Sequence, residues 1–94
     1  MNVRYYIDSE TGLPHIYKHN ISEFEVETVL KKPGEDRPGK EGSRIAIGKT
    51  ESGKFIRIIY VPESSKESIF VITAYEISGN VLKAYRRRRR RKKL

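Results

Sequence analysis

The sequence contains no cysteine and no long run of apolar residues. Without cysteine, the chain has no disulfide framework, no thiolate zinc site and no thiol nucleophile. The longest apolar runs are only a few residues, far below the roughly 20 residues that a membrane-spanning helix needs. The first residues also lack the apolar segment of a secretory signal peptide. We therefore expect a cytoplasmic protein with no membrane partner.

Motifs for several enzyme classes are also missing. Gly48, Gly53 and Gly79 form neither a phosphate-binding loop nor a dinucleotide-binding fingerprint. The acidic residues are scattered and provide no paired-carboxylate site of the kind that magnesium-dependent nucleases require. The spacing of His15 and His19 permits metal binding, but no third ligand accompanies them. The sequence therefore predicts no cofactor and no metal.

Positive charge is concentrated at the C-terminal end of the chain. The 94 residues include 20 basic and 12 acidic side chains, which gives a net charge of +8. Residues 86–93 hold eight of the basic side chains and none of the acidic ones, so residues 1–85 are neutral overall. We predict a single domain over residues 1–85 and a basic Arg/Lys-rich tail over residues 86–94. Because neighbouring arginines repel one another, the preceding helix is expected to fray beyond about Tyr85.

A capping box marks the clearest helix. Ser22 is followed three residues later by Glu25, a spacing at which each side chain can bond to the other's backbone N–H. A Pro-Gly pair stops the pattern, which predicts a helix over residues 22–32. Residues 33–43 then hold no apolar side chain and five Pro or Gly residues, so they are expected to form a mobile loop.

An alternation of period two near the N-terminus and three later apolar runs, separated by turn residues, predict four strands. The expected strands cover residues 3–8, 44–48, 55–61 and 68–77, with helical segments at about 14–19 and from Asn80 onward. This order is typical of an α+β fold. We predict a small, mainly antiparallel sheet, made of the N-terminal strand and a three-stranded meander, with the helices packed on one face.

Several short motifs resemble one toxin family. Lys18-His19-Asn20-Ile21-Ser22 resembles the Lys-His-Gly-Val-Ser start of a helix in BrnT-type toxins. It is also similar to the related DUF4258 domains, which place a His before an Ile-Ser-x-x-x-Val helix. Residues 47–60 look like the Gly-x-Thr-x-x-Gly-Arg strand pair of those toxins, and residues 70–74 resemble their following strand. The similarity covers about residues 15–85.

The resemblance implies a small domain of the RelE-like type. Such proteins are often ribonuclease toxins that a partner antitoxin neutralises, so an antitoxin is an expected partner. Two features depart from the toxins. Tyr75 stands where they usually have Arg, and Ile77-Ser78-Gly79-Asn80 does not reproduce their Ala-Thr-x-x-Glu stretch. Tyr75 is closer to the DUF4258 domains, whose activity is unsettled.

Metal-independent cleavage of RNA needs a proton acceptor, a proton donor and cations that stabilise the developing negative charge. The resemblance implies that Arg and Lys side chains on strands do this work, together with a nearby Tyr or His. The expected catalytic residues are Arg57, His19, Tyr75 and Lys49.

Each of these assignments has a plainer alternative. A salt bridge from Arg57 to Glu76 or Glu51 would also explain a cation on a sheet face. Lys49 flanks a hairpin tip, where solvated lysines are ordinary. Tyr75 could belong to the core, and His19 could pack against other residues or cap a helix.

Nucleic acid, and RNA in particular, is the expected partner of the basic residues. Guanidinium groups contact phosphates bidentately, and phosphates relieve the repulsion among consecutive arginines. An acidic protein is the alternative partner, whereas the absence of an accompanying apolar face argues against a membrane anchor. The expected nucleic-acid-binding residues are Arg44, Lys54, Tyr85, Arg86, Arg87, Arg88, Arg89, Arg90, Arg91, Lys92 and Lys93.

Three functions stay open at this point. The leading hypothesis is an RNA-binding protein that acts as a metal-independent endoribonuclease of a toxin–antitoxin system. The second is a non-catalytic RNA- or ribosome-associated module, and the third is a protein-interaction domain that docks an acidic partner.

Overall fold

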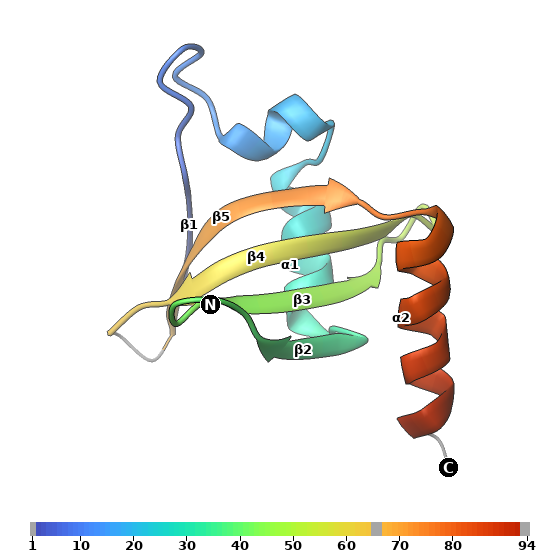
Figure 1. Ribbon diagram of the computed structural model, residues 1–94. Helices are drawn as coiled ribbons and strands as arrows, with labels where there is room; N and C mark the ends of the chain where they lie inside the picture. The colour runs from blue at the N-terminus through green and yellow to red at the C-terminus, as the bar shows by residue number, and fades with distance from the viewer. Residues whose placement is uncertain (1, 65–66, 93–94) are drawn as a thin grey trace.

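The structure, a computed structural model, describes residues 2–64 and 67–92. Its elements are β1 (Asn2–Tyr5), the short 3₁₀ helix η1 (His15–His19), α1 (Glu23–Lys31), β2 (Glu35–Pro38), β3 (Arg44–Lys49), β4 (Phe55–Pro62), β5 (Ser68–Glu76) and α2 (Gly79–Lys92). The five strands form one sheet in the order β1-β5-β4-β3-β2 (Figure 1). The α+β class predicted from the sequence is confirmed.

Helix α1 begins at the predicted capping box. The hydroxyl of Ser22 accepts a hydrogen bond from the Glu25 N–H at 3.1 Å, and the Glu25 carboxylate accepts one from the Ser22 N–H at 2.9 Å. The apolar stripe of the helix packs on one face of the sheet, which we call the first face. The buried core there consists of Ile16, Ile21, Val26, Val29, Ala46, Ile56, Ile58, Tyr60, Val71 and Ala74.

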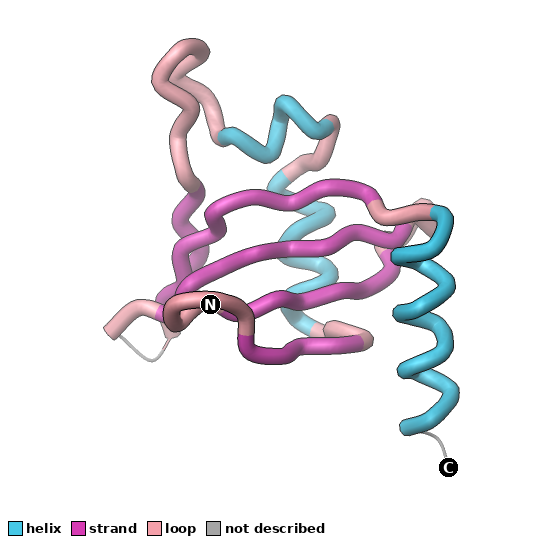
Figure 2. The backbone as a smooth tube through the Cα atoms, in the orientation of Figure 1, coloured by secondary structure: helices cyan, strands magenta, loops and turns pink. Residues whose placement is uncertain are grey.

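The opposite, second face of the sheet carries its own apolar cluster. That cluster consists of Ile45, Ile47, Ile77 and Tyr85, with Phe55, Ile59, Tyr75 and Leu82 packed against them. Because α2 contributes to it, α1 and α2 contact opposite faces; Figure 2 shows α1 behind the sheet and α2 beside the strand ends. The expectation that the helices share one face is therefore wrong. The reason lies in β3, where the run from Ile45 to Gly48 is buried on both faces.

The expected loop over residues 33–43 contains strand β2. Its residues Glu35 and Arg37 stand opposite Ile47 and Ile45 of β3. Backbone pairing needs no apolar side chain, and an edge strand rich in charge and ending in proline is a common protection against edge-to-edge association. The polar sequence of β2 therefore lacks the apolar pattern by which a strand is predicted.

Strand β1 makes the sheet mixed. It pairs parallel with β5, whereas the other strand pairs in the described chain are antiparallel. A parallel pair requires a long crossover, which the chain supplies between Tyr5 and Ser68. Val3 and Tyr5 pack on the first-face core, and Arg4 lies on the second face, 5.3 Å from the Phe70 ring centroid.

Helix α2 runs to Lys92, past the fraying point expected near Tyr85. Cations in the last turns of a helix interact favourably with the helix dipole. Some of the arginines also find acceptors on the body of the protein, as described below. Lys93 lies outside the described residues. Within the described chain, no helix is both long and apolar enough to cross a bilayer.

Candidate nucleic-acid interface

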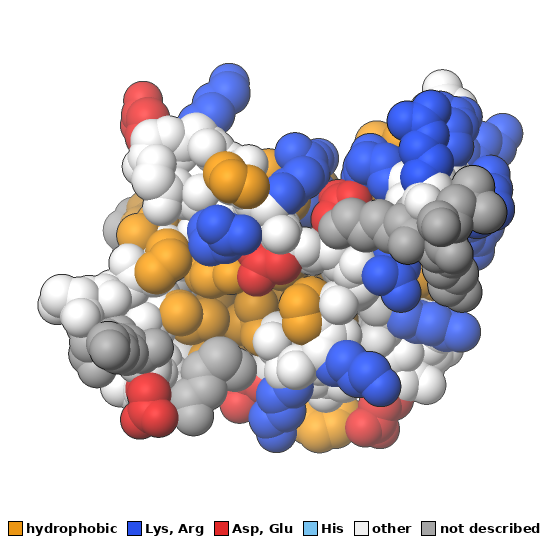
Figure 3. Space-filling view, turned by 90° about the horizontal axis from the view of Figure 1, so that it is seen from below, with side chains coloured by type: hydrophobic (Ala, Val, Ile, Leu, Met, Phe, Trp, Pro, Cys, Tyr) orange, Lys and Arg blue, Asp and Glu red, His pale blue; other side chains and the backbone are white. Residues whose placement is uncertain are grey.

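A cleft of about 630 Å³ opens between α2 and the neighbouring end of the sheet. Its described lining includes five Lys or Arg residues and no acidic residue, so we call it the cationic cleft. Lys and Arg side chains gather around α2 at the right of Figure 3. The lining consists of Lys32, Pro33, Gly34, Lys49, Phe55, Tyr85, Arg86, Arg89 and Arg90.

Three elements bring these cations together. Arg89 and Arg90 lie three and four residues after Arg86, and such spacings place them on the same side of α2 as Arg86. Lys32 is the C-cap of α1, and Lys49 is the last residue of β3. The cations therefore converge on one space from separate parts of the chain.

Helix α2 is anchored beside the cleft by the carboxylate of Glu35. This side chain is 5% exposed and accepts two hydrogen bonds from Arg88, at 2.6 and 2.9 Å, and one from Arg37 at 3.2 Å. The bonds from Arg88, followed by those from Arg37, hold the pKa of Glu35 below its usual value. Nearby, the Arg89 guanidinium donates to the carbonyl oxygen of Gly34 at 2.7 Å. These contacts fix the wall of the cleft before any ligand arrives.

Removing the Arg88 side chain tests this anchor. Arg88→Ala is expected to lower the free energy of unfolding by about 2 kcal/mol, because the buried carboxylate keeps only one cationic partner. The loss stays below that of a fully buried pair since the Arg88 side chain is 38% exposed. Urea unfolding measures it. Arg87→Ala removes the same charge from the adjacent position and is expected to change stability by less than about 0.5 kcal/mol. Equal losses in the two variants would contradict the anchor.

Arg57 lies in the middle of the second-face cluster. It stands in register between Ile47 of β3 and Tyr75 of β5, both members of that cluster. Its Nε is buried and has no hydrogen-bond partner among the described residues. The alternative salt bridge from Arg57 to Glu76 is not formed, because Glu76 is paired with the residue before Arg57 and so belongs to the other face. A buried polar group without a partner is unfavourable, and an anion would supply one.

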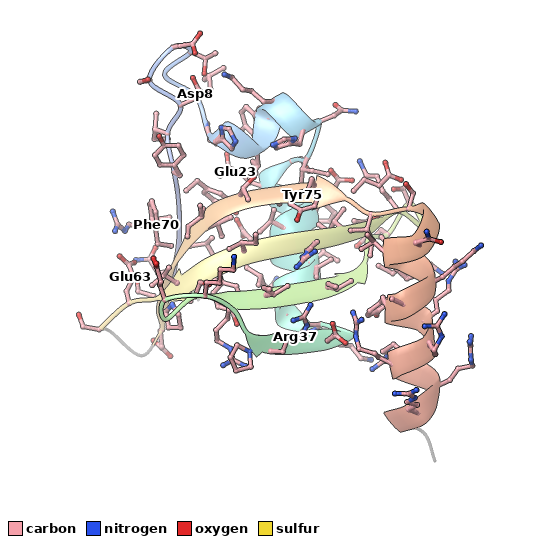
Figure 4. All side chains as sticks on the ribbon, viewed as in Figure 1. Asp8, Glu23, Arg37, Glu63, Phe70 and Tyr75 are labelled. Atoms are coloured by element: carbon pink, nitrogen blue, oxygen red, sulfur yellow. The ribbon has the colours of Figure 1, made fainter. Side chains whose placement is uncertain are left out.

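The short helix η1 places His19 near Tyr75, and His15 lies next to His19. The His19 ring is 6.0 Å from the Tyr75 ring and 5.3 Å from the His15 ring, centroid to centroid. Figure 4 shows Tyr75 on β5, below η1. Tyr75 is thus adjacent to two other predicted catalytic residues, since it pairs with Arg57 of β4 and lies near the ring of His19. The fourth, Lys49, lies in the cationic cleft with its Nζ 6.0 Å from the Phe55 ring centroid.

Sequence reasoning missed Asp8, which lies between β1 and η1 in the chain and contacts two residues of η1. Its buried carboxylate accepts hydrogen bonds from the Glu10 N–H at 2.8 Å and pairs with Lys18 at 2.8 Å. The oxygen that pairs with Lys18, Oδ2, also lies 3.4 Å from Nδ1 of His15. These contacts, with Lys18 first, hold the pKa of Asp8 well below its usual range. An Asp followed by Ser-Glu-Thr-Gly is a typical turn start, and that signal was present in the sequence.

Two of the predicted nucleic-acid-binding residues are paired with carboxylates outside the cleft. Nζ of Lys54 lies 3.1 Å from the Glu25 carboxylate on the α1 side, and Nε of Arg44 donates to Asp36 at 2.9 Å. Neither residue lines the cationic cleft. Lys32, in contrast, lines the cleft and was not among the predicted nucleic-acid-binding residues. Whether Lys54 and Arg44 bind nucleic acid stays a prediction.

The six arginines of α2 divide into three sets. Arg86, Arg89 and Arg90 line the cleft, and Arg88 is bound to Glu35. Arg87 and Arg91 are exposed and line neither described pocket. Tyr85 is 5% exposed, and its burial raises the pKa of the phenol. The tyrosine therefore serves as the apolar base of the cleft. Across residues 2–64 and 67–92, no group of three or more metal-ligating side chains is placed to hold an ion.

Comparison with known proteins gives one match. Residues 15–76, from η1 to the end of β5, match a family described as a domain of unknown function, DUF4258. No curated protein and no solved structure matches the chain. Strand β1 and helix α2 lie outside the matched segment.

Proposed function

The chain belongs to the DUF4258 family, and we propose that it binds single-stranded RNA through the cationic cleft. The observation that carries the proposal is the convergence of five cations, without a carboxylate among the described lining residues, on one concave surface. Cationic grooves of this kind follow the phosphate backbone of single strands. The preference for RNA over DNA rests on the resemblance of residues 18–30 and 47–61 to BrnT-type toxins of the RelE-like type.

Removing two cleft arginines tests this function. Arg86→Ala/Arg90→Ala is expected to weaken binding of a labelled single-stranded RNA by about tenfold and to reduce the salt slope by about 1.4, since each phosphate contact to a single strand contributes about 0.7. Fluorescence anisotropy between ~50 and ~200 mM salt gives both quantities.

The matched control is Arg87→Ala/Arg91→Ala. It removes the same charge at the same spacing from α2, but from two residues that do not line the cleft. We expect a loss of less than about threefold, the size of a solvated surface contact. If both double variants weaken binding equally, the charge of α2 acts diffusely and the cleft is not the interface. If RNA does not bind at all, an acidic protein becomes the favoured partner.

A second candidate function is metal-independent cleavage of the bound RNA. It is favoured by Arg57, whose Nε has no hydrogen-bond partner among the described residues. Arg57 is paired with Tyr75 of β5, and on its own strand it is the next residue after Phe55 on the same face. Phe55 in turn lines the cleft. In this proposal the 2′-hydroxyl loses its proton and attacks the adjacent phosphorus, the bond from phosphorus to the 5′-oxygen breaks to give a 2′,3′-cyclic phosphate and a 5′-hydroxyl, and Arg57 stabilises the phosphorane charge. His19 or Tyr75 transfers the protons, and Lys49 holds the neighbouring phosphate.

Incubation of the purified protein with RNA in EDTA separates the two candidates. Cleavage under these conditions, together with slowed growth on expression, would support a ribonuclease toxin and justify a search for an antitoxin partner. Intact RNA with binding retained would leave a non-catalytic RNA-binding module.

A further inference from the structure

The cationic cleft is lined by five cations. Their charge exceeds the negative charge that the phosphodiesters of an internal strand bring into the same volume. Each internal phosphodiester carries one negative charge, whereas a terminal phosphate carries about 1.5 to 2. Lys32 and Lys49 approach from the sheet side, and three arginines approach from α2. Facing cations repel one another, and the ligand that relieves this repulsion best is the one with the most charge in the smallest volume.

The aromatic side chains of the cleft do not offer a stacking surface. The guanidinium carbon of Arg86 is 5.3 Å, and the Lys49 Nζ 6.0 Å, from the Phe55 ring centroid, so two cations already lie over that ring. Tyr85 is 5% exposed and packs against Phe55 with its centroid 5.9 Å away. A nucleobase would have to displace a cation or uncover a buried ring. The cleft is thus suited to binding phosphate, and its described lining offers no free aromatic surface that would contact the base.

The cleft is also held in shape without a ligand. The bonds from Arg88 to Glu35 and from Arg89 to the Gly34 carbonyl fix the helix against β2. A preformed site binds more tightly because fewer side chains lose freedom when the ligand arrives. The volume of about 630 Å³ falls within the roughly 300–1,000 Å³ of sites that enclose a small molecule.

We propose that the cationic cleft binds a chain of contiguous phosphates, either the 5′-triphosphate end of an RNA or a free nucleoside polyphosphate. This inference rests on the proposed RNA-binding function and names the group that the same site recognises. Contiguous phosphates concentrate several charges in a small volume, so they offset the charge of the five lining cations better than the spaced phosphates of an internal strand.

The first experiment compares two RNAs of one sequence that differ only at the 5′ end, in EDTA and ~0.15 M salt. The 5′-triphosphate RNA is expected to bind about tenfold more tightly than the 5′-hydroxyl RNA, the effect of one further charge-assisted contact. Arg86→Ala/Arg90→Ala should abolish this difference, and Arg87→Ala/Arg91→Ala should keep it. Equal binding of both RNAs by the unaltered protein, without competition by tripolyphosphate, overturns the inference but leaves RNA binding standing.

The second experiment identifies the source of the phosphates. Inorganic tripolyphosphate and the four nucleoside triphosphates are titrated as competitors of the labelled RNA, and all five are expected to compete within about threefold of one another because the base is not contacted. Competition by the free compounds with no preference for the triphosphate RNA end would identify a free polyphosphate as the ligand. A strong preference for one base would contradict the proposal. If neither RNA binds, the proposed function itself fails.

Discussion

Gly34→Ala is expected to destabilise the protein by about 3 kcal/mol, which is at the upper end of the usual effect of overpacking. A Cβ at this position would lie 1.9 Å from the Tyr85 hydroxyl oxygen and 3.1 Å from its Cζ. The ring cannot swing aside, since it is 5% exposed and packed in the second-face cluster. Gly34 does not have a positive φ, so alanine fits the backbone and the clash alone is responsible.

The measurement separates global unfolding from release of the helix. Urea unfolding gives the free energy, and a loss of about 3 kcal/mol corresponds to a fall in the melting temperature on the order of 15 °C for a domain of this size. Amide hydrogen exchange over α2 reports whether the helix detaches first. Either result removes one wall of the cationic cleft, so RNA binding should weaken as well.

The rescue variant is Gly34→Ala/Tyr85→Phe. Among the described residues the Tyr85 hydroxyl has no hydrogen-bond partner within the chain, so Tyr85→Phe alone should change stability by less than about 1 kcal/mol. The combined variant removes the atom that clashes and should recover most of the loss. A double variant no more stable than Gly34→Ala would show that the tyrosine does not lie against residue 34.

Arg57→Ala is expected to reduce metal-independent RNA cleavage by about 100- to 1,000-fold, the usual effect of removing one group that stabilises a transition-state charge. Binding of uncleaved RNA should fall by less than about threefold, because the proposed interface takes most of its backbone contacts from the cleft. Single-turnover cleavage in EDTA, with binding measured separately on a substrate lacking the reactive 2′-hydroxyl, gives the two effects independently.

Arg37→Lys is the control for this change. Arg37 is also an arginine of the second face, but it is already paired with the Glu35 carboxylate. Lysine keeps that pairing charge, so cleavage should stay within about twofold. Arg57→Lys, in contrast, keeps the charge but loses the planar donor group, and should restore only part of the activity. Unchanged cleavage in Arg57→Ala would exclude Arg57 from the chemistry.

The local signals in the sequence predicted the fold well where they act over a few residues. The capping box of Ser22 and Glu25 placed α1 correctly, and the apolar runs placed the three strands of the meander. The misjudged features depend on distant partners. Strand β2 owes its pairing to β3, and the position of α2 depends on an apolar face formed by Ile45 and Ile59. No local pattern encodes such contacts.

The same distinction applies to the candidate site. Arg57, Tyr75 and His19 were selected individually, and the register of β4 with β5 and the place of η1 bring them together. Charge alone did not distinguish free cations from paired ones. Lys54 is bound by Glu25, whereas Lys49, only five positions earlier, lines the cleft. Which lysine faces a carboxylate follows from the side of the sheet on which it lies.

The parallel pairing of β1 with β5 has a consequence for how the chain assembles during synthesis. The Val3↔Ile69 and Tyr5↔Val71 pairs join residues from nearly opposite ends of the chain. Closing so long a loop is entropically slow, and contacts of this range delay folding. A nascent chain therefore leaves the ribosome with its first strand unpaired until β5 has emerged. Helix α2 follows β5 in the chain, so it docks onto a sheet whose far edge has only just been completed.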